Sequence, residues 1–393
     1  MIQNLKELSS TPLRRKALQI IDSGLESINT EKVISNNIKL KNNTLNIKNK
    51  KINLKKFKRI VIIGFGKASS LMGKELEKVL GSRIDTGIII STKGLNLKRI
   101  KVIKGTHPMP SQKNISATKK IIGLISNLEK DDLVICLVSG GGSALLCYPN
   151  IPFKQYIKTI KKAFLSGKDI NTLNKLRKKY SHVKGGKLAG LTKAKIVSLI
   201  FSDVVGDDLN TIASGPTVKK GLKNVTNILL LNNKVALEAM KKKALSLGLK
   251  PIILTNKLKG EARIVGKRLI SSLKNKKGKN IALLFAGETT VTVKGNGKGG
   301  RNQELCLGAI EDISKLNNTA LISIGSDGMD GTSNAAGALV DNNSLKKAKT
   351  FNLDYKKHLK NNASHSFFKK TNELVFTGLT GSNVADIGII IKL

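Results

Sequence analysis

Runs of consecutive apolar residues alternate with stretches of helical spacing along most of the chain. Strands covered on both faces appear as continuous apolar runs, because neither face needs polar side chains. Such runs occupy residues 60–63, 87–90, 100–103, 133–139 and 196–202. Helical spacing falls between several of them, as at 67–80 and 116–128. This alternation predicts an α/β fold with a Rossmann-like, doubly wound parallel sheet.

A second block of strands is predicted in the C-terminal part of the chain. Helices at 233–247 and 260–274 precede it, with a strand at 251–255. Its strands are predicted at 281–286, 289–294, 320–325, 373–377 and 387–392. A chain of 393 residues exceeds the usual length of one domain. We therefore expect two domains, a Rossmann-like α/β domain over 1–275 and a smaller α/β domain over 276–393.

The N-terminal segment has a different pattern. Residues 5–28 place apolar side chains on one side and predict a helix. Residues 39–58 are rich in Lys and Asn and have low complexity. We expect this second segment to be a surface connector with at most a weak hairpin.

Charge raises the question of a polyanionic partner. The formal net charge is +44, from 70 basic and 26 acidic residues. Nucleic-acid surfaces favour Arg forks and interleaved aromatic residues. Only nine of the basic residues are Arg, and aromatic residues make up 4%. Abundant Lys, Asn and Ile together are also what an A/T-rich coding sequence produces. We therefore expect no specific nucleic-acid partner, although the field around the protein should attract small anions.

The cysteine count and the apolar stretches indicate the cellular compartment of the protein. Three cysteines without a CxxC spacing cannot build a disulfide framework. The N-terminus carries Glu7 and lacks the apolar core of a signal peptide. The longest uncharged stretch, 133–153, is interrupted by three glycines and closed by prolines, unlike a helix in lipid. We expect a cytoplasmic monomer or homodimer with no membrane partner.

Glycine-rich turns end the predicted N-terminal strands, at the sheet edge where open α/β sheets bind ligands. The first turn contains Gly64, Gly66 and Lys67, but Ser69 replaces the third glycine of a dinucleotide fingerprint. The second turn is a candidate anion nest. It consists of Ser139, Gly140, Gly141, Gly142 and Ser143. A tight structural turn would use the same residue types.

Carboxylates follow the strand at 196–202. Asp203 and Asp207 are candidate ligands of Mg²⁺, which takes oxygen ligands together with waters and substrate phosphates. One of them could instead accept a proton from a hydroxyl. Turn formation and helix capping by Asp would explain the same pattern.

The C-terminal turns also carry candidate groups. Gly287, Glu288 and Thr289 follow one strand, and Arg301 starts a helix after a glycine-rich segment. A guanidinium in such a position can bind phosphate or carboxylate with two parallel hydrogen bonds. Asp327 and Asn383 lie in two later turns, which ordinary turn chemistry also explains. His107 lies in a proline-rich loop, where a structural role is the ordinary interpretation.

Taken together, these blocks resemble the glycerate 2-kinase family, whose C-terminal region is called the MOFRL domain. The blocks that carry the resemblance are GFGKAS (64–69), HPMP (107–110), LVSGGGSALL (137–146), NKLRKKYSHVKGGKLAG (174–190), SDVVGDDLNTIASGPT (202–217), GETTVTVKGNGKGGRNQE (287–304), GSDGMDGTSNAAGA (325–338) and FTGLTGSNVAD (376–386). The resemblance extends from about residue 13 to the C-terminus.

The resemblance implies ATP-dependent phosphorylation of D-glycerate to 2-phosphoglycerate, with Mg²⁺, in a cleft between two α/β domains. It implies that Lys67 and Arg301 are catalytic. Some relatives are named hydroxypyruvate reductases, so a reductase using a nicotinamide cofactor is the alternative.

Phosphoryl transfer needs positive charge and in-line positioning. Asp203 is a third candidate catalytic residue, either orienting the metal or accepting the hydroxyl proton. The first two turns and the Gly287–Thr289 turn are candidates for holding the nucleotide. Asp327 and Asn383 could position glycerate hydroxyls, and Arg177 or Lys184 could bind the glycerate carboxylate.

Overall fold

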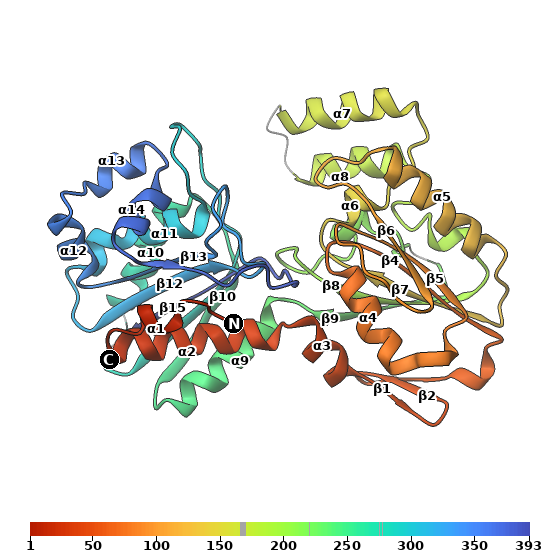
Figure 1. Cartoon of the computed structure of the whole chain (residues 1–393), viewed down its shortest axis with the longest axis horizontal. Helices are drawn as coiled ribbons and strands as arrows, with labels where there is room; N and C mark the ends of the chain where they lie inside the picture. Colours follow the sequence, from red (N-terminus) through yellow and green to blue (C-terminus); the bar gives the residue numbers. More distant parts are fainter. Residues whose placement is uncertain (166–169, 220, 275, 277) are drawn as a thin grey trace. The chain divides into compact units, whose positions relative to one another are not determined.

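The computed structural model describes residues 1–165, 170–219, 221–274, 276 and 278–393 (Figure 1). The chain forms two compact units. Residues 30–232 form the first, here called the Rossmann-like unit. Residues 1–29 and 233–393 form the second, here called the mixed-sheet unit.

Six parallel strands build the sheet of the Rossmann-like unit. They are β4 (Arg59–Phe65), β5 (Thr86–Ser91), β6 (Ile100–Lys104), β7 (Asp132–Val138), β8 (Lys195–Phe201) and β9 (Val225–Leu231). Their spatial order is β6-β5-β4-β7-β8-β9, so the order reverses between β4 and β7. The α/β class and the parallel sheet are confirmed. Ligands bind at such a reversal, beyond the carboxyl ends of the strands.

Helices cover both faces of this sheet. The helix α4 (Ser69–Leu80) packs against β4 and β5, and α3 (Thr30–Asn37) packs against α4. On the other face, α5 (Gln112–Ser126) places Ile121 and Ile125 in a core with Val134. Three further helices were not predicted in detail: α6 (Gly142–Leu145), α7 (Phe153–Leu165) and α8 (Ile170–Lys179).

The Lys/Asn-rich segment is more regular than expected. It forms an antiparallel three-stranded sheet of β1 (Ile38–Lys41), β2 (Thr44–Ile47) and β3 (Lys50–Asn53). Leu45 and Ile47 are buried, and Asn42 and Lys48 have positive φ in the two turns. The prediction of a connector missed this sheet because so few apolar residues hold it.

The mixed-sheet unit has a sheet of the order β10-β11-β15-β12-β13-β14. Its strands are β10 (Lys250–Leu258), β11 (Ile281–Gly287), β12 (Thr319–Gly325), β13 (Gly337–Asp341), β14 (Leu374–Val375) and β15 (Asp386–Lys392). Strand β10 is parallel to β11, and β15 runs antiparallel between β11 and β12. The strand predicted at 289–294 is wrong, because there only Thr290 makes an isolated bridge, to Glu261.

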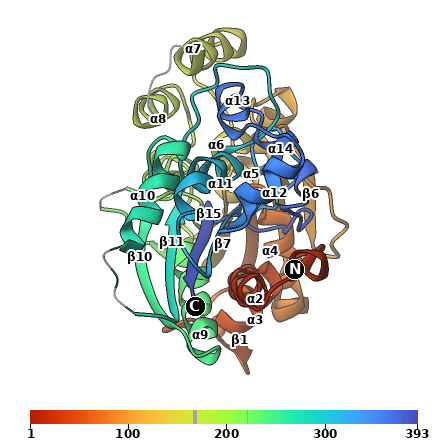
Figure 2. The ribbon, with the colours of Figure 1, turned by 90° about the vertical axis from the view of Figure 1, so that its left-hand side faces the viewer.

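Figures 1 and 2 show helices on both faces of this second sheet. On one face lie α2 (Pro12–Ser27) and α9 (Asn233–Ser246). On the other lie α10 (Ala262–Lys274) and α11 (Arg301–Ile313). Four short helices complete the unit: α1 (Leu5–Leu8), α12 (Ser344–Thr350), α13 (Tyr355–Lys360) and α14 (Ser364–Lys370).

The single N-terminal helix predicted at 5–28 is two helices. Thr11 is the N-cap of α2. Its side chain accepts a hydrogen bond from the Arg14 N–H, and Pro12 occupies the first turn of the helix. Within α2, Arg14 is buried and pairs with Asp341 and Glu373, both at 2.6 Å. These ion pairs attach the N-terminal helix to the C-terminal strands.

The compact units therefore divide the chain at 29/30 and 232/233, not at the predicted domain boundary of 275/276. The helix α2, the segment from α9 to α10 and the C-terminal strands belong to one compact unit. Among the helices within the described ranges, none is both long and apolar enough to cross a membrane.

Candidate active site

The turns after β4 and β7 interlock at the reversal of strand order. The Lys67 N–H donates to the Gly140 carbonyl at 2.8 Å, and the Ala68 N–H donates to Ser139 Oγ at 3.1 Å. Gly66 has φ +135°, and a Cβ there would lie 2.1 Å from Ser139 Oγ. Only glycine allows this approach. Two turns that are about seventy residues apart in the sequence thus form one structure.

Three polar side chains surround Gly140 and Gly141. A Cβ on Gly140 would lie 2.0 Å from Asp203 Oδ2. A Cβ on Gly141 would lie 3.1 Å from both Lys67 Cγ and His107 Cδ2. We call Gly140–Gly142 the glycine nest. The nest therefore has a carboxylate on one side, and a lysine and an imidazole on the other.

His107 is the member of this group whose importance the sequence analysis underrated. Desolvation, with the charges of Lys67 and Arg177, lowers its pKa to about 4. The ring keeps an exposed edge but is neutral at pH 7. The presence of a histidine beside two cations indicates a site built for negative charge. The HPMP motif in the sequence pointed to this residue, but its position along the chain could not show that His107 lies beside the glycine nest.

Lys184 lies beneath the nest. Its Nζ is fully buried and donates to the carbonyls of Ser143 and Leu146, at 2.7 and 2.8 Å. Burial lowers the pKa of Lys184 to about 7, with the charge of Arg177 acting in the same direction and Cys147 opposing it. In this structure Lys184 holds the backbone of the turn in place. Its contact with substrate stays a prediction.

Arg177, the second candidate for the substrate carboxylate, is largely withdrawn from water on α8. Burial lowers its pKa, partly offset by Tyr156 and Cys147. It lines a pocket together with Thr106 and Pro108, the two sequence neighbours of His107.

The two candidate metal ligands behave differently. Asp203 points toward Gly140, whereas Asp207 Oδ2 accepts a hydrogen bond from Asn232 at 2.7 Å. Asp207 also has φ +61° and shapes its own turn. Within the described ranges, no three His, Cys, Asp or Glu residues gather in a metal-binding group.

A second cluster lies at one edge of the sheet in the mixed-sheet unit. Asp386, the first residue of β15, is in register with both Gly287 at the end of β11 and Gly325 at the end of β12. Because β15 runs opposite to its two neighbours, its first residue meets the carboxyl ends of both. The turns that contain Glu288 and Asp327 therefore begin on either side of Asp386.

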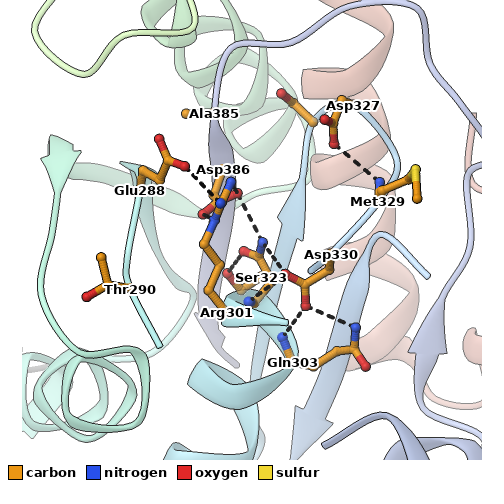
Figure 3. A network of polar contacts seen from close by, with 12 residues as sticks. Glu288, Thr290, Arg301, Gln303, Ser323, Asp327, Met329, Asp330, Ala385 and Asp386 are labelled. Carbon is orange, nitrogen blue, oxygen red and sulfur yellow. Dashed lines mark hydrogen bonds and ion pairs between the residues drawn. The ribbon is translucent and has the colours of Figure 1, made fainter. Parts of the chain in front are cut away.

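Arg301 reaches this edge from the first position of α11 (Figure 3). Its Nε and Nη2 donate to the two Asp386 oxygens at 2.6 and 2.9 Å, and Nη1 pairs with Glu288 at 2.8 Å. Burial alone would lower the pKa of Arg301, but Asp386 and Glu288 raise it on balance. Arg301 therefore stays charged with its plane fixed, and two of its five N–H groups are not used by these contacts.

Asp330 fixes the start of α11. Its carboxylate accepts hydrogen bonds from the backbone and side-chain amides of Asn302 and Gln303, at 2.9–3.2 Å. Desolvation raises the pKa of Asp330 to about 6, although these hydrogen bonds oppose it. Sequence reasoning missed both Asp330 and Asp386. Asp330 belongs to a quoted block, but only the fold shows which helix it caps.

A pocket of about 440 Å³ opens beside Arg301. Its lining includes Glu288, Thr289, Gly299 and Gly300. Thr289 Oγ1 is buried there and has no hydrogen-bond partner in the described part of the chain. A buried hydroxyl without a partner is rare, so this group is suited to bind a ligand.

Asp327 and Asn383 mainly shape their turns. Asp327 Oδ1 accepts the Met329 N–H at 3.3 Å, as Figure 3 shows, and Asn383 Oδ1 accepts the Ala385 N–H at 2.9 Å. Both side chains keep some exposure to solvent. Their contact with glycerate stays a prediction.

The sequence matches two families. Residues 16–247 match the family described as Domain of unknown function (DUF4147), and residues 281–386 match the MOFRL family. The chain thus belongs to a class of α/β proteins in which both segments occur.

Known proteins define this class further. A Glycerate 2-kinase of Pyrococcus horikoshii is 36% identical, over 85% of this chain and 87% of that protein. A D-glycerate 2-kinase of Thermotoga maritima is 32% identical, over 96% and 99%. The crystal structure of a glycerate kinase from Thermotoga maritima has a TM-score of 0.86 and 31% identity, covering 96% of this chain and 98% of that one. The chain therefore belongs to the glycerate 2-kinase family.

Not every relative is named a glycerate kinase. An Agrobacterium vitis protein, 35% identical over 85% of this chain and 99% of its own length, has been named, provisionally, a hydroxypyruvate reductase.

Proposed function

We propose that this chain transfers the terminal phosphoryl group of ATP to the C2 hydroxyl of D-glycerate. The observation that carries the proposal is the convergence of Lys67, His107 and Asp203 on the glycine nest, at the reversal of strand order. Family membership supports it, because the relatives described above include glycerate 2-kinases. Backbone amides in such a nest, with a lysine beside them, are suited to phosphate oxygens.

The Rossmann-like unit would bind the phosphates of ATP. Glycines at 64, 66 and 140–142 let the backbone approach them, and Ser139 holds the two turns together. Lys67 is exposed beside the nest, so its ammonium can follow the phosphoryl group during transfer. Positive charge placed before the reaction lowers the energy of a transition state that spreads negative charge.

Asp203 fits a role with Mg²⁺. Mg²⁺ commonly uses one or two carboxylates and completes its shell with waters and substrate phosphates. A single carboxylate aimed at a phosphate nest meets that requirement. Mg²⁺ bound there would neutralise phosphate charge. Asp207 is the weaker candidate because Asn232 already binds its carboxylate. Accepting the hydroxyl proton remains the other role proposed for Asp203.

The mixed-sheet unit would contribute Arg301. Asp386 and Glu288 fix its guanidinium in the lining of a pocket that Thr289 also lines. The remaining N–H groups of Arg301 could bind a carboxylate or a transferring phosphoryl group. Asp327 and Asn383, from this unit, and Arg177 and Lys184, from the other, stay candidates for binding glycerate.

The proposal is tested with purified protein, ATP, D-glycerate and Mg²⁺. We expect ADP to form only when glycerate is present, and phosphorus NMR to show a phosphoester at C2. Removal of Mg²⁺ by a chelator should stop turnover. If NADH is instead oxidised with hydroxypyruvate while glycerate yields no ADP, the reductase activity replaces this proposal. Ser69 in the third fingerprint position argues against that outcome.

We also propose that the protein acts in the cytoplasm as a monomer or homodimer.

The basic surface of the protein should retain nucleic acid only weakly and only at low salt. Binding that persists at near-physiological salt would contradict this, because nonspecific phosphate contacts weaken steeply as salt rises.

A further inference from the structure

An apolar groove lies next to the glycine nest within the Rossmann-like unit. It has a volume of about 950 Å³ and is formed by the loop at 106–111, the start of α5, α7 and α8. Its apolar lining is Pro108, Met109, Pro110, Phe153, Ile157 and Ile160. Met109 is 38% exposed. Large apolar side chains left open to solvent in a concave surface mark a binding site more often than a chance exposure.

The groove and the nest are continuous. Thr106 and Pro108 line the groove, and His107 between them has its ring against Gly141 of the nest. Arg177 lines the groove as well, and its charge acts on His107. One residue therefore separates an apolar slot from a cationic, glycine-lined site.

The loop that forms one wall of the groove is fixed. The buried Asn114 Oδ1 accepts hydrogen bonds from the Thr106 N–H at 3.0 Å and the Ser111 N–H at 3.3 Å. Thr106 Oγ1 also donates to the Met109 carbonyl at 2.9 Å. A wall held by these bonds loses little conformational freedom when a ligand enters.

We propose that this groove binds the nucleobase of ATP, with the triphosphate extending past His107 into the glycine nest. The inference rests on the proposed kinase function and adds the place where the base lies. A nucleoside triphosphate joins a flat, largely apolar ring to a polyanion, and the groove and nest join the two matching surfaces in the same order. Arg177 lines the groove as well, so in this arrangement it would contact the sugar or the first phosphate and not the glycerate carboxylate. The apolar surface of a peptide or of a second copy of this chain would fit the groove, but neither would supply the polyanion that fits the cationic nest beside it.

The test compares the binding of ADP and of inorganic triphosphate by calorimetry, using the full chain. The variants are Met109→Ala and Ile157→Ala, both in the groove. Leu245→Ala, on α9 and 57% exposed, is the control. Truncation of an apolar contact should weaken ADP binding by roughly 5- to 30-fold in each groove variant. Triphosphate binding should stay within about twofold, because its contacts are in the nest.

Each outcome has a distinct meaning. Unchanged ADP affinity in both groove variants, with ATP-dependent turnover intact, overturns the nucleobase site and leaves the kinase proposal standing. An equal loss of ADP and triphosphate binding also overturns it, since the substitutions would then have disturbed the nest. If the unaltered protein binds neither compound, the proposed function fails together with this inference. Thermal unfolding of each variant verifies that the fold persists.

Discussion

At the scale of single residues, the glycine nest depends on charged side chains whose places are set by the surrounding backbone. Lys67 follows a strand end, and its own N–H is bound to Gly140, so its side chain starts from a fixed point. The chain has 70 basic residues, so positive charge by itself does not single out Lys67. Position, and not charge alone, should therefore distinguish Lys67.

We predict that Lys67→Ala lowers kcat for glycerate phosphorylation by about 10²- to 10³-fold, the usual effect of removing one preorganised contact to the transition state. Lys58→Ala is the matched control, since Lys58 is 79% exposed and pairs only with Asp131 in the contacts described. Steady-state kinetics with both variants is the measurement. Similar kcat values for the two variants would remove Lys67 from the mechanism.

His107 offers a spectroscopic test. Its pKa of about 4 reflects desolvation and two cations, so bound polyphosphate should raise it by about one unit or more. By linkage, the lowered pKa also costs stability as the pH falls from 6.5 toward 4, because the unfolded chain binds that proton more tightly. NMR titration of labelled histidines, with His107→Gln to assign the signal, measures the pKa with and without inorganic triphosphate. A pKa that triphosphate leaves unmoved would place the phosphates elsewhere.

At the scale of elements, the turn between β7 and α6 has two roles. It ends a buried strand, and it brings Gly140 so close to the Asp203 carboxylate that any side chain on residue 140 would collide with it. Gly140 does not have a positive φ, so its backbone would accept alanine. Glycine is needed at this position because of the neighbouring carboxylate.

We predict that Gly140→Ala abolishes most activity while changing the free energy of unfolding by less than about 1 kcal/mol. The new methyl group displaces the end of the Asp203 side chain, which can turn away without moving the strand. Gly123→Ala, in α5 with open space around it, is the control and should stabilise the protein by about 0.5–1 kcal/mol. Chemical denaturation and kinetics measure the two effects. Full activity in Gly140→Ala would show that the position of Asp203 does not matter.

At the scale of the whole molecule, the N-terminal helix belongs to the unit formed by the C-terminal strands. Arg14 on α2 is buried between Asp341 and Glu373, more than three hundred residues away in the sequence. The ends of the chain thus close one unit, and residues 30–232 form the other between them.

We predict that Arg14→Ala lowers the free energy of unfolding of the mixed-sheet unit by about 3–5 kcal/mol, because two buried carboxylates lose their counter-charge. The neighbouring Arg15 is exposed, so Arg15→Ala should change stability by less than about 0.5 kcal/mol. Urea denaturation followed by circular dichroism makes the comparison. Equal stability of the two variants would mean that α2 contributes little to this unit.

Much of the local structure was predictable from the sequence. Apolar runs located β4, β7 and β8 closely, since a strand buried on both faces needs no polar positions. Glycine patterns marked the turns that became the nest. The predicted strand at 289–294 failed because its alternation of residue types lacks a pairing partner along its length.

What the sequence determined by itself were features that depend on near neighbours: the class of fold, most strands, and the turns rich in glycine. Only the tertiary structure decided which turns meet. The order of the parallel strands brings the turn at 64–66 against Ser139, and the antiparallel course of β15 brings Asp386 to Arg301. The physical reason is that periodicity reflects the burial of adjacent residues, whereas strand order and long-range ion pairs depend on how the whole chain buries its surface.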